Sequence, residues 1–272
     1  MTFVEVPGGA FAMGDDGPLA YPADGESPRR QTTVATFSIA TMAVTNAEFA
    51  AFVDTTGYVT EAQRFGWSFV FVGLLPADFP PTRAVASSPW WRQVHGAAWH
   101  RPEGPHSSLD GREHHPVAHV TYADALAYVR WAGLRLPTEA EWEYASRAGT
   151  DTTFPWGTEL EPDGVHVCNV FQGSFPDHDT GADGWAGTCP VDTYAPNAFG
   201  LHNTIGNVWE WTADVFTIDR PASAADGPDA PRVLKGGSYL CHHSYCHRYR
   251  PGARVASTPD SSSGNTGFRC AL

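Results

Sequence analysis

The sequence predicts an α+β protein that forms one loop-rich domain, with its helices in the first half of the chain. Three observations lead to this prediction. Gly and Pro supply 27 and 22 of the 272 residues, helix start signals occur only before residue 150, and 42% of residues are apolar, which is enough for a sizeable core. No Ser/Gly tract, charge block or repeat divides the chain, so we expect a single domain over residues 1–272.

Three helices are expected from their capping signals. Each begins at a threonine that can cap the helix, has an acidic residue three positions later, and ends close to a glycine. The segments run from Thr45 to Gly57, from Thr121 to Ala132 and from Thr138 to Gly149. After Gly149, Gly, Pro, Asn and Asp occur every few residues, which predicts short strands and long loops.

Charge and motif content exclude several function classes. With 30 acidic and 17 basic side chains the net charge is −13, which opposes binding to nucleic acid or to an anionic membrane surface. No apolar run approaches the roughly 18 residues of a membrane span, and Met1–Glu5 lacks the pattern of an export signal. We therefore expect a cytoplasmic protein. GxGxxG, GxxxxGK[ST] and GxSxG motifs are absent, so nucleotide-binding and serine-hydrolase functions lack support.

Two cysteines near the end of the chain form the first candidate site. Cys241 and Cys246 stand in the segment GGSYLCHHSYCHRYR, which runs from Gly236 to Arg250. On a strand they would face opposite sides, and on a helix they would lie about 140° apart. The two sulfurs can therefore meet only in an irregular turn.

The sequence around this pair is basic although the chain as a whole is acidic. From Pro231 to Pro259 there is no Asp or Glu. The cationic side chains of this stretch are Arg232, Lys235, Arg248, Arg250 and Arg254. Near the sulfurs they would favour thiolate over thiol. Two thiolates could form a redox disulfide, bind a soft metal such as Cu(I), or join histidines around zinc, whereas the alternative is two buried structural cysteines.

A second candidate site is rich in oxygen ligands. Between Asn169 and Glu210, carboxylate and amide side chains alternate with glycines without helical or strand periodicity. Ca²⁺ takes 6–8 oxygen ligands in flexible geometry and would suit such loops, whereas the alternative is ordinary Asx-turn bonding. For the three histidines between His114 and His119 we favour structural roles, because Pro116 breaks a helix and no open metal-site pattern accompanies them.

Over nearly its whole length the sequence resembles the formylglycine-generating enzymes, also called sulfatase-modifying factors. The likeness is carried by GGSYLCHHSYCHRYR at 236–250, TPDSS at 258–262 and GFRC at 267–270. Three further segments are shared with a wider superfamily that includes iron-dependent sulfoxide synthases and phage-type binding proteins. These are VPGGAFAMG at 6–14, RLPTEAEWE at 135–143 and GNVWEW at 206–211. The cysteine pair distinguishes the formylglycine branch.

The resemblance implies a C-type-lectin-like fold with little regular secondary structure. It also implies an oxidase that uses O2 and a thiol reductant to convert a cysteine in a CxPxR motif of an unfolded or nascent sulfatase polypeptide into formylglycine. In that family the cysteines that match Cys241 and Cys246 hold Cu(I), and the substrate thiolate joins them as a third sulfur. The positions that match the family's active-site lining are Ser238, Trp209, Tyr245 and Asn265.

Two structural calcium sites follow from the same resemblance, with Val, Gly and Trp contributing backbone carbonyls. The first maps onto Asn169, Val170, Asp183 and Trp185, and the second onto Asn203, Gly206, Val208 and Glu210. Some relatives pair the cysteine that matches Cys270 with one at the position of Ser146, so Cys270 is expected to be free here. Cys168 and Cys189 could form an extra disulfide, but a reducing cytoplasm favours structural roles.

Two rival functions remain at this point. A calcium-dependent lectin-type binding module would explain the oxygen-rich loops and the 10 Trp residues, but it gives no reason for two thiols among cations. An iron-dependent sulfoxide synthase would carry an additional helical domain with a three-histidine iron motif, and we expect no room for that domain in 272 residues.

Overall fold

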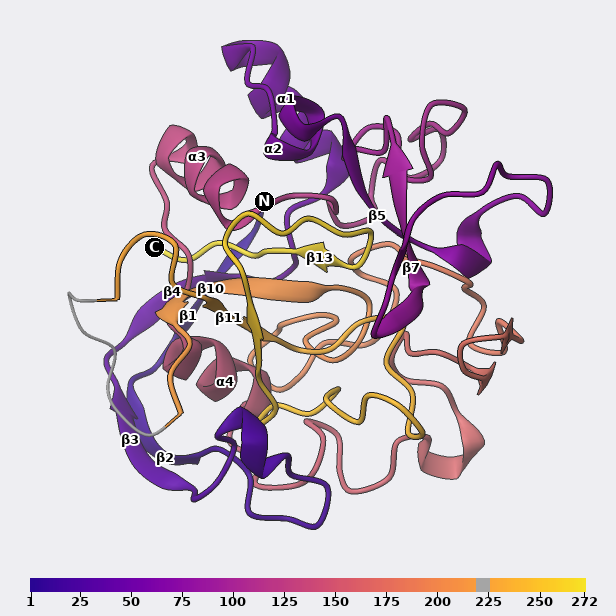
Figure 1. Ribbon diagram of the computed structural model, residues 1–272. Helices are drawn as coiled ribbons and strands as arrows, with labels where there is room; N and C mark the ends of the chain where they lie inside the picture. The colour runs from indigo at the N-terminus through magenta and orange to yellow at the C-terminus, as the bar shows by residue number, and fades with distance from the viewer. Residues whose placement is uncertain (219–225) are drawn as a thin grey trace.

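A mixed four-stranded sheet lies in the middle of the protein (Figure 1). The structure is a computed structural model that describes residues 1–218 and 226–272. The strand order of the sheet is β12-β11-β10-β13, with bounds Val255–Ser257, Arg232–Lys235, Trp209–Val215 and Thr266–Gly267. β11 pairs antiparallel with β10 and β12, whereas β13 runs parallel to β10.

Smaller sheets surround this centre, as the α+β prediction requires. β1 (Phe3–Val6) pairs with β4 (Phe37–Ala40), β2 (Gly9–Met13) with β3 (Arg30–Val34), and β8 (Gly173–Ser174) with β9 (His178–Asp179). A three-stranded sheet has the order β5-β7-β6, with bounds Trp67–Phe71, Ser88–His95 and Ala84–Val85. The described residues also contain three short 3₁₀ helices, η1 (Pro22–Asp24), η2 (Val72–Leu74) and η3 (Pro162–Gly164).

The three expected helices are present. They are α1 (Asn46–Thr56), α3 (Tyr122–Ala132) and α4 (Glu139–Arg147), and each begins with a complete capping box. α4 ends earlier than the predicted stop at Gly149, because Ala148 already adopts the left-handed conformation (φ 47°) and closes the helix. A fourth helix, α2 (Glu61–Phe65), was not predicted.

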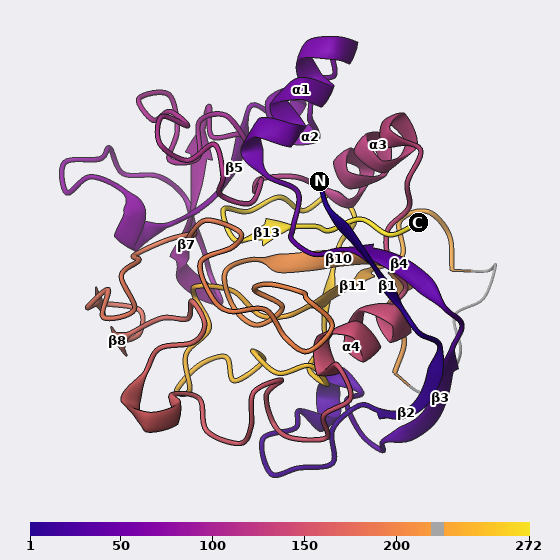
Figure 2. The ribbon, with the colours of Figure 1, turned by 180° about the vertical axis from the view of Figure 1, so that it is seen from behind.

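The core lies between the central sheet and the helices. α3 lies above and α4 below the sheet in Figures 1 and 2. Trp142 of α4 and Trp211 of β10 are buried, and Trp211 donates a hydrogen bond to the Val120 carbonyl. None of the described helices has the length and apolar character to cross a membrane.

The second half of the chain is built from loops and short strands, as predicted. Beyond residue 149 the described segments contain strands of two to seven residues and one 3₁₀ turn, but no α-helix. Backbone hydrogen bonds between distant loops hold this half together, such as the 3.0 Å bond from Phe171 N to Cys241 O. This bond joins the oxygen-rich loop that contains Phe171 to the backbone of Cys241.

Candidate functional site

The cysteine turn, residues 238–246, brings the two predicted sulfurs together. Cys241 N donates to Ser238 O (2.9 Å) and Cys246 N to His242 O (2.7 Å), which gives the irregular backbone that the five-residue spacing requires. The two Sγ atoms lie 3.0 Å apart, well beyond the roughly 2.05 Å of a disulfide bond. Both cysteines are free and buried, with exposed fractions of 1% and 7%.

The two thiols have different acidities. A hydrogen bond from Cys241 lowers the pKa of the Cys246 thiol, with a further contribution from the backbone N–H and guanidinium of Arg248. Burial raises the pKa of Cys241 well above its ordinary value. The two Sγ atoms share a hydrogen bond, and Cys246 is the more acidic thiol of the pair.

Ser238 and Asn265 join the cysteine pair in one polar network. The Ser238 backbone N–H donates to Cys241 Sγ at 3.4 Å, and Asn265 Nδ2 donates to Ser238 Oγ at 2.9 Å. Trp209 N donates to Asn265 O (2.8 Å), and Trp209 belongs to the same core cluster as both cysteines. The structure thus brings five of the six predicted active-site residues together.

The sixth residue, Tyr245, lies at the surface and outside this network. Its ring is 43% exposed and stacks on Phe175 with a centroid distance of 4.6 Å and an interplanar angle of 5°. Trp90 of β7 meets Tyr245 edge-on at 4.6 Å. Tyr245 therefore adds an apolar, partly exposed platform beside the cysteine turn.

A small cavity opens onto the cysteine pair. It has a volume of about 230 Å³, and Cys241 lines it together with the oxygen-rich loop. The other lining residues are Leu160, Glu161, Val170, Phe171, Gln172, Gly173, His242, His243 and Tyr249. Cys241 is thus buried in the fold but lines a space that a ligand can enter.

Most of the cations in this region do not face the sulfurs. Lys235 pairs with Glu143 (2.9 Å), Arg250 with Glu26 (2.8 Å) and Arg254 with Glu139 (2.8 Å), and all three cations are buried. These acids come from distant parts of the chain and neutralise the basic stretch. Of these five cations, Arg248 is the one that lowers the pKa of the Cys246 thiol.

The oxygen-rich loops contain buried acceptors without partners. Asp183 Oδ2 and Asn203 Oδ1 are buried, and neither accepts a hydrogen bond. Burial raises the pKa of Asp183, and the nearby charge of Asp179 raises it further. Arg269 and Trp142 donate to both oxygens of Glu210, so this buried carboxylate has partners within the protein.

Asn207 connects these loops to each other and to the cysteine turn. Its Oδ1 accepts from Cys189 N (3.0 Å), and its Nδ2 donates to Cys189 O (3.1 Å). Its backbone N–H donates to Asn169 O (2.8 Å), and its carbonyl accepts from Tyr239 N (3.0 Å). Asn207 therefore links the positions of both loops to the position of the segment that follows Ser238.

The remaining three cysteines are free and buried. Cys168 and Cys189 do not form a disulfide, in agreement with the structural roles that we favoured, and Cys270 is likewise free. Ser146, at the position where some relatives carry a cysteine, is fully buried and its hydroxyl has no partner.

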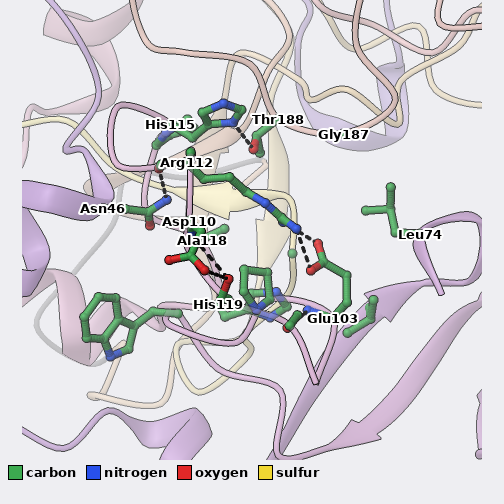
Figure 3. A pocket seen from close by; sticks show the side chains of 18 of the residues that line it. Asn46, Leu74, Glu103, Asp110, Arg112, His115, Ala118, His119, Gly187 and Thr188 are labelled. Atoms are coloured by element: carbon green, nitrogen blue, oxygen red, sulfur yellow. Dashed lines mark hydrogen bonds and ion pairs between the residues drawn. The ribbon is translucent and has the colours of Figure 1, made fainter. Parts of the chain in front are cut away.

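A larger cavity of about 740 Å³ lies elsewhere and contains neither Cys241 nor Cys246 (Figure 3). Figure 3 shows the Arg112 guanidinium paired with Glu103, and His115 hydrogen-bonded to Thr188. His119 also lines this cavity, and burial lowers its pKa to about 3. No group of three metal-ligating side chains occurs within residues 1–218 and 226–272.

Sequence reasoning missed the residues that hold Arg248. The Asp24 carboxylate binds its guanidinium, and the Tyr21 ring lies under it with 3.8 Å between the guanidinium carbon and the ring centroid. Asp24 and Arg248 are 224 positions apart, and no local pattern around Asp24 signals the contact.

Comparisons with known proteins agree with this arrangement. Residues 1–272 match the family described as "Sulfatase-modifying factor enzyme 1-like domain". The formylglycine-generating enzyme of Thermomonospora curvata is 54% identical over 279 residues, which cover 98% of this chain and 92% of that protein. A Bos taurus relative, named inactive C-alpha-formylglycine-generating enzyme 2, is 43% identical and covers 100% and 88% of the two chains.

The fold has a solved counterpart as well. PvdO from Pseudomonas aeruginosa superposes with a TM-score of 0.69 at 26% identity and covers 99% of this chain and 93% of its own. Together with the family match, this likeness agrees with the C-type-lectin-like fold expected from the sequence. The fold alone does not determine activity, because one relative is named inactive. Activity depends on the residues at the reactive site.

Proposed function

Since the chain belongs to the sulfatase-modifying factor enzyme 1-like family, we propose that it is an oxidase that converts a sulfatase cysteine into formylglycine. The proposed substrate is a CxPxR segment of an unfolded or nascent sulfatase, with O2 as oxidant and a thiol as reductant. The observation that carries the proposal is a pair of free, buried sulfurs 3.0 Å apart beside a cavity of about 230 Å³.

Cu(I) is the proposed metal of this pair, and the donor set fits it. Two soft sulfurs on one short turn suit Cu(I). Cys241 and Cys246 would hold the ion. When bound, Cu(I) supplies the redox chemistry with O2 that no side chain provides.

The surrounding residues have separate tasks in this proposal. Asn265 orients Ser238, whose N–H and hydroxyl contact Cys241 and keep its sulfur at the edge of the cavity. The lowered pKa of Cys246 reduces the cost of removing the proton that this thiol must lose when it binds a metal. Tyr245 offers the incoming peptide an apolar surface next to the sulfurs.

Calcium is proposed as a structural ion in the two oxygen-rich loops. Support comes from the unpartnered buried oxygens of Asp183 and Asn203, since such acceptors are costly unless a cation or water satisfies them. Backbone carbonyls would complete the ligand set. Site 1 comprises Asn169, Val170, Asp183 and Trp185, and site 2 comprises Asn203, Gly206, Val208 and Glu210.

The activity test uses purified protein loaded with one equivalent of Cu(I), a CxPxR peptide, O2 and a thiol. We expect mass spectrometry to detect the peptide aldehyde, which Cys241→Ala should abolish together with copper binding. Cys270→Ala is the matched control, because Cys270 is also free and buried but belongs to no part of the proposed site. Equal aldehyde yields from the Cys241 variant and the parent, or activity that follows iron content instead of copper, would refute the proposal.

The calcium test counts bound ions. After dialysis against micromolar Ca²⁺, the parent should retain two ions per chain by mass spectrometry, and Asp183→Asn should retain one. Asp177→Asn, a change in the same loop region, should retain both. A parent protein that binds no Ca²⁺, or an Asp183 variant that keeps two ions, would contradict the assignment.

A further inference from the structure

A segment near the N-terminus lies against the residues that follow the cysteine turn. We call residues 15–26 the strap. Its two ends meet, because Asp15 N donates to Glu26 O at 2.9 Å. Gly14 permits this closure, since it has φ +99° and a Cβ at this position would lie 2.3 Å from Glu26 O. The strap is therefore a closed loop of fixed shape.

Both ends of the strap bind one buried arginine. The Arg250 guanidinium pairs with Asp15 and, at 2.8 Å, with Glu26. Arg250 is 1% exposed and Glu26 is fully buried, so this contact is shielded from water. Arg250 Nε also donates to His247 O (2.8 Å), which links the base of the strap to the segment that leaves the cysteine turn.

The middle of the strap contacts the two residues next to Cys246. The Tyr21 hydroxyl accepts a hydrogen bond from His247 N at 3.0 Å. The Arg248 guanidinium lies over the Tyr21 ring, 3.8 Å from its centroid, and binds the Asp24 carboxylate. The turn η1 fixes Asp24 itself, because Asp24 N donates to Tyr21 O at 2.9 Å.

Arg248 in turn lies two residues beyond Cys246. Its backbone N–H and its guanidinium are close enough to Cys246 to lower the pKa of this thiol. An arginine side chain with no other partner samples many rotamers, whereas one held by a carboxylate and an aromatic ring keeps its donors in one direction. Partners behind a metal ligand commonly determine how well that ligand binds.

We propose that Asp24 and Tyr21 are positioning residues for the sulfur of Cys246 and act on it through Arg248. The role in metal binding rests on the proposed function, because it takes Cys246 as a Cu(I) ligand. The contacts that join the strap to His247 and Arg248 involve no metal, so their effect on Cys246 can also be tested without copper.

The first experiment measures Cu(I) affinity by competition with a chromogenic Cu(I) chelator. Asp24→Asn should weaken binding roughly 10- to 100-fold, the usual effect of losing a partner behind a ligand, with an unchanged unfolding temperature. Asp16→Asn is the matched control in the same strap, because Asp16 accepts only from Arg29 N and should bind as the parent does. Parent-like affinity in the Asp24 variant would overturn the proposal.

A double-mutant cycle tests whether Asp24 acts through Arg248. In an Arg248→Gln background, Asp24→Asn should cause no further loss of affinity, whereas an equal further loss would mean that Asp24 acts by another route. For Tyr21, Tyr21→Phe keeps the ring under Arg248 and should lose less affinity than Tyr21→Leu. Equal losses of affinity in these two variants would mean that the Tyr21 ring does not help to hold Arg248.

A copper-independent measurement separates this proposal from the proposed function. In metal-free protein, the rate at which iodoacetamide labels Cys246, followed by mass spectrometry, should fall in Asp24→Asn but not in Asp16→Asn. If the parent bound no Cu(I), the proposed function would fail, and the labelling rates would still decide the role of the strap. Equal rates in parent and Asp24→Asn would overturn it.

Discussion

Replacing Asn207 with alanine removes a carboxamide that three loops share. Asn207 is 2% exposed, and it holds Cys189 by two hydrogen bonds of 3.0 and 3.1 Å. In Asn207→Ala the N–H and the carbonyl of Cys189 lose their partner inside a fully buried residue. The Asn169 side chain also loses an acceptor, because its Nδ2 donates to Asn207 Oδ1 at 3.4 Å.

The expected destabilisation follows from these two groups. A buried backbone group left without a partner costs about 1–3 kcal/mol, so the variant should lose about 2–6 kcal/mol in its free energy of unfolding. Asn207 also has φ +59°, which alanine tolerates less well than asparagine. Asn207→Gly removes the same hydrogen bonds but accepts this backbone angle, so it should recover about 1 kcal/mol relative to alanine.

Equilibrium urea unfolding at pH 7.5 in the presence of EGTA measures these differences without any contribution from Ca²⁺. Parallel unfolding slopes for the three proteins are required for the comparison. A loss below about 1 kcal/mol in Asn207→Ala would refute the reasoning, because it would mean that water satisfies the Cys189 groups.

Three further outcomes are expected. Burial lowers the pKa of His119 to about 3 from an ordinary 6.5, so the unfolded chain binds its proton first and the parent loses up to about 1.4 kcal/mol per pH unit as pH falls from 6.5 towards 3. His119→Gln should remove that slope in urea unfolding, and a pH-independent difference between the two proteins would contradict it. Lys235→Met removes one of two buried cations that pair with Glu143, the other being Arg147, and should cost about 1.5–3 kcal/mol, so a loss below about 1 kcal/mol in the same assay would argue against the pairing. Gly206→Ala should yield no folded protein by circular dichroism, because its Cβ would lie 2.2 Å from Asn169 O, and a native spectrum would contradict this expectation.

Local chemistry made the helices predictable from sequence. A capping box joins residues three positions apart, so Thr45 with Glu48 or Thr138 with Glu141 can be recognised without knowing the fold. α2 carries the same box, Thr60 with Gln63, but its five residues are too few to show a periodic apolar face. The sequence therefore contains the start signal of α2 but lacks the periodic apolar pattern that would support a helix.

The cysteine turn was predictable for a different reason. Spacing excluded regular structure for Cys241 and Cys246, and the turn found between them is irregular. The charges around the turn could not be predicted, because their partners depend on tertiary contacts. Lys235 and Arg254 have no acid nearby in sequence, but α4 supplies both partners. A locally basic stretch thus became a set of buried ion pairs.

The sequence separation between the strap and the cysteine turn has a consequence for biosynthesis. A ribosome makes Tyr21 and Asp24 before their respective partners, His247 and Arg248, which follow 226 and 224 positions later. Closing such a long loop is slow compared with forming local contacts. A nascent chain therefore lacks the contacts that hold Arg248 until synthesis has passed the cysteine turn.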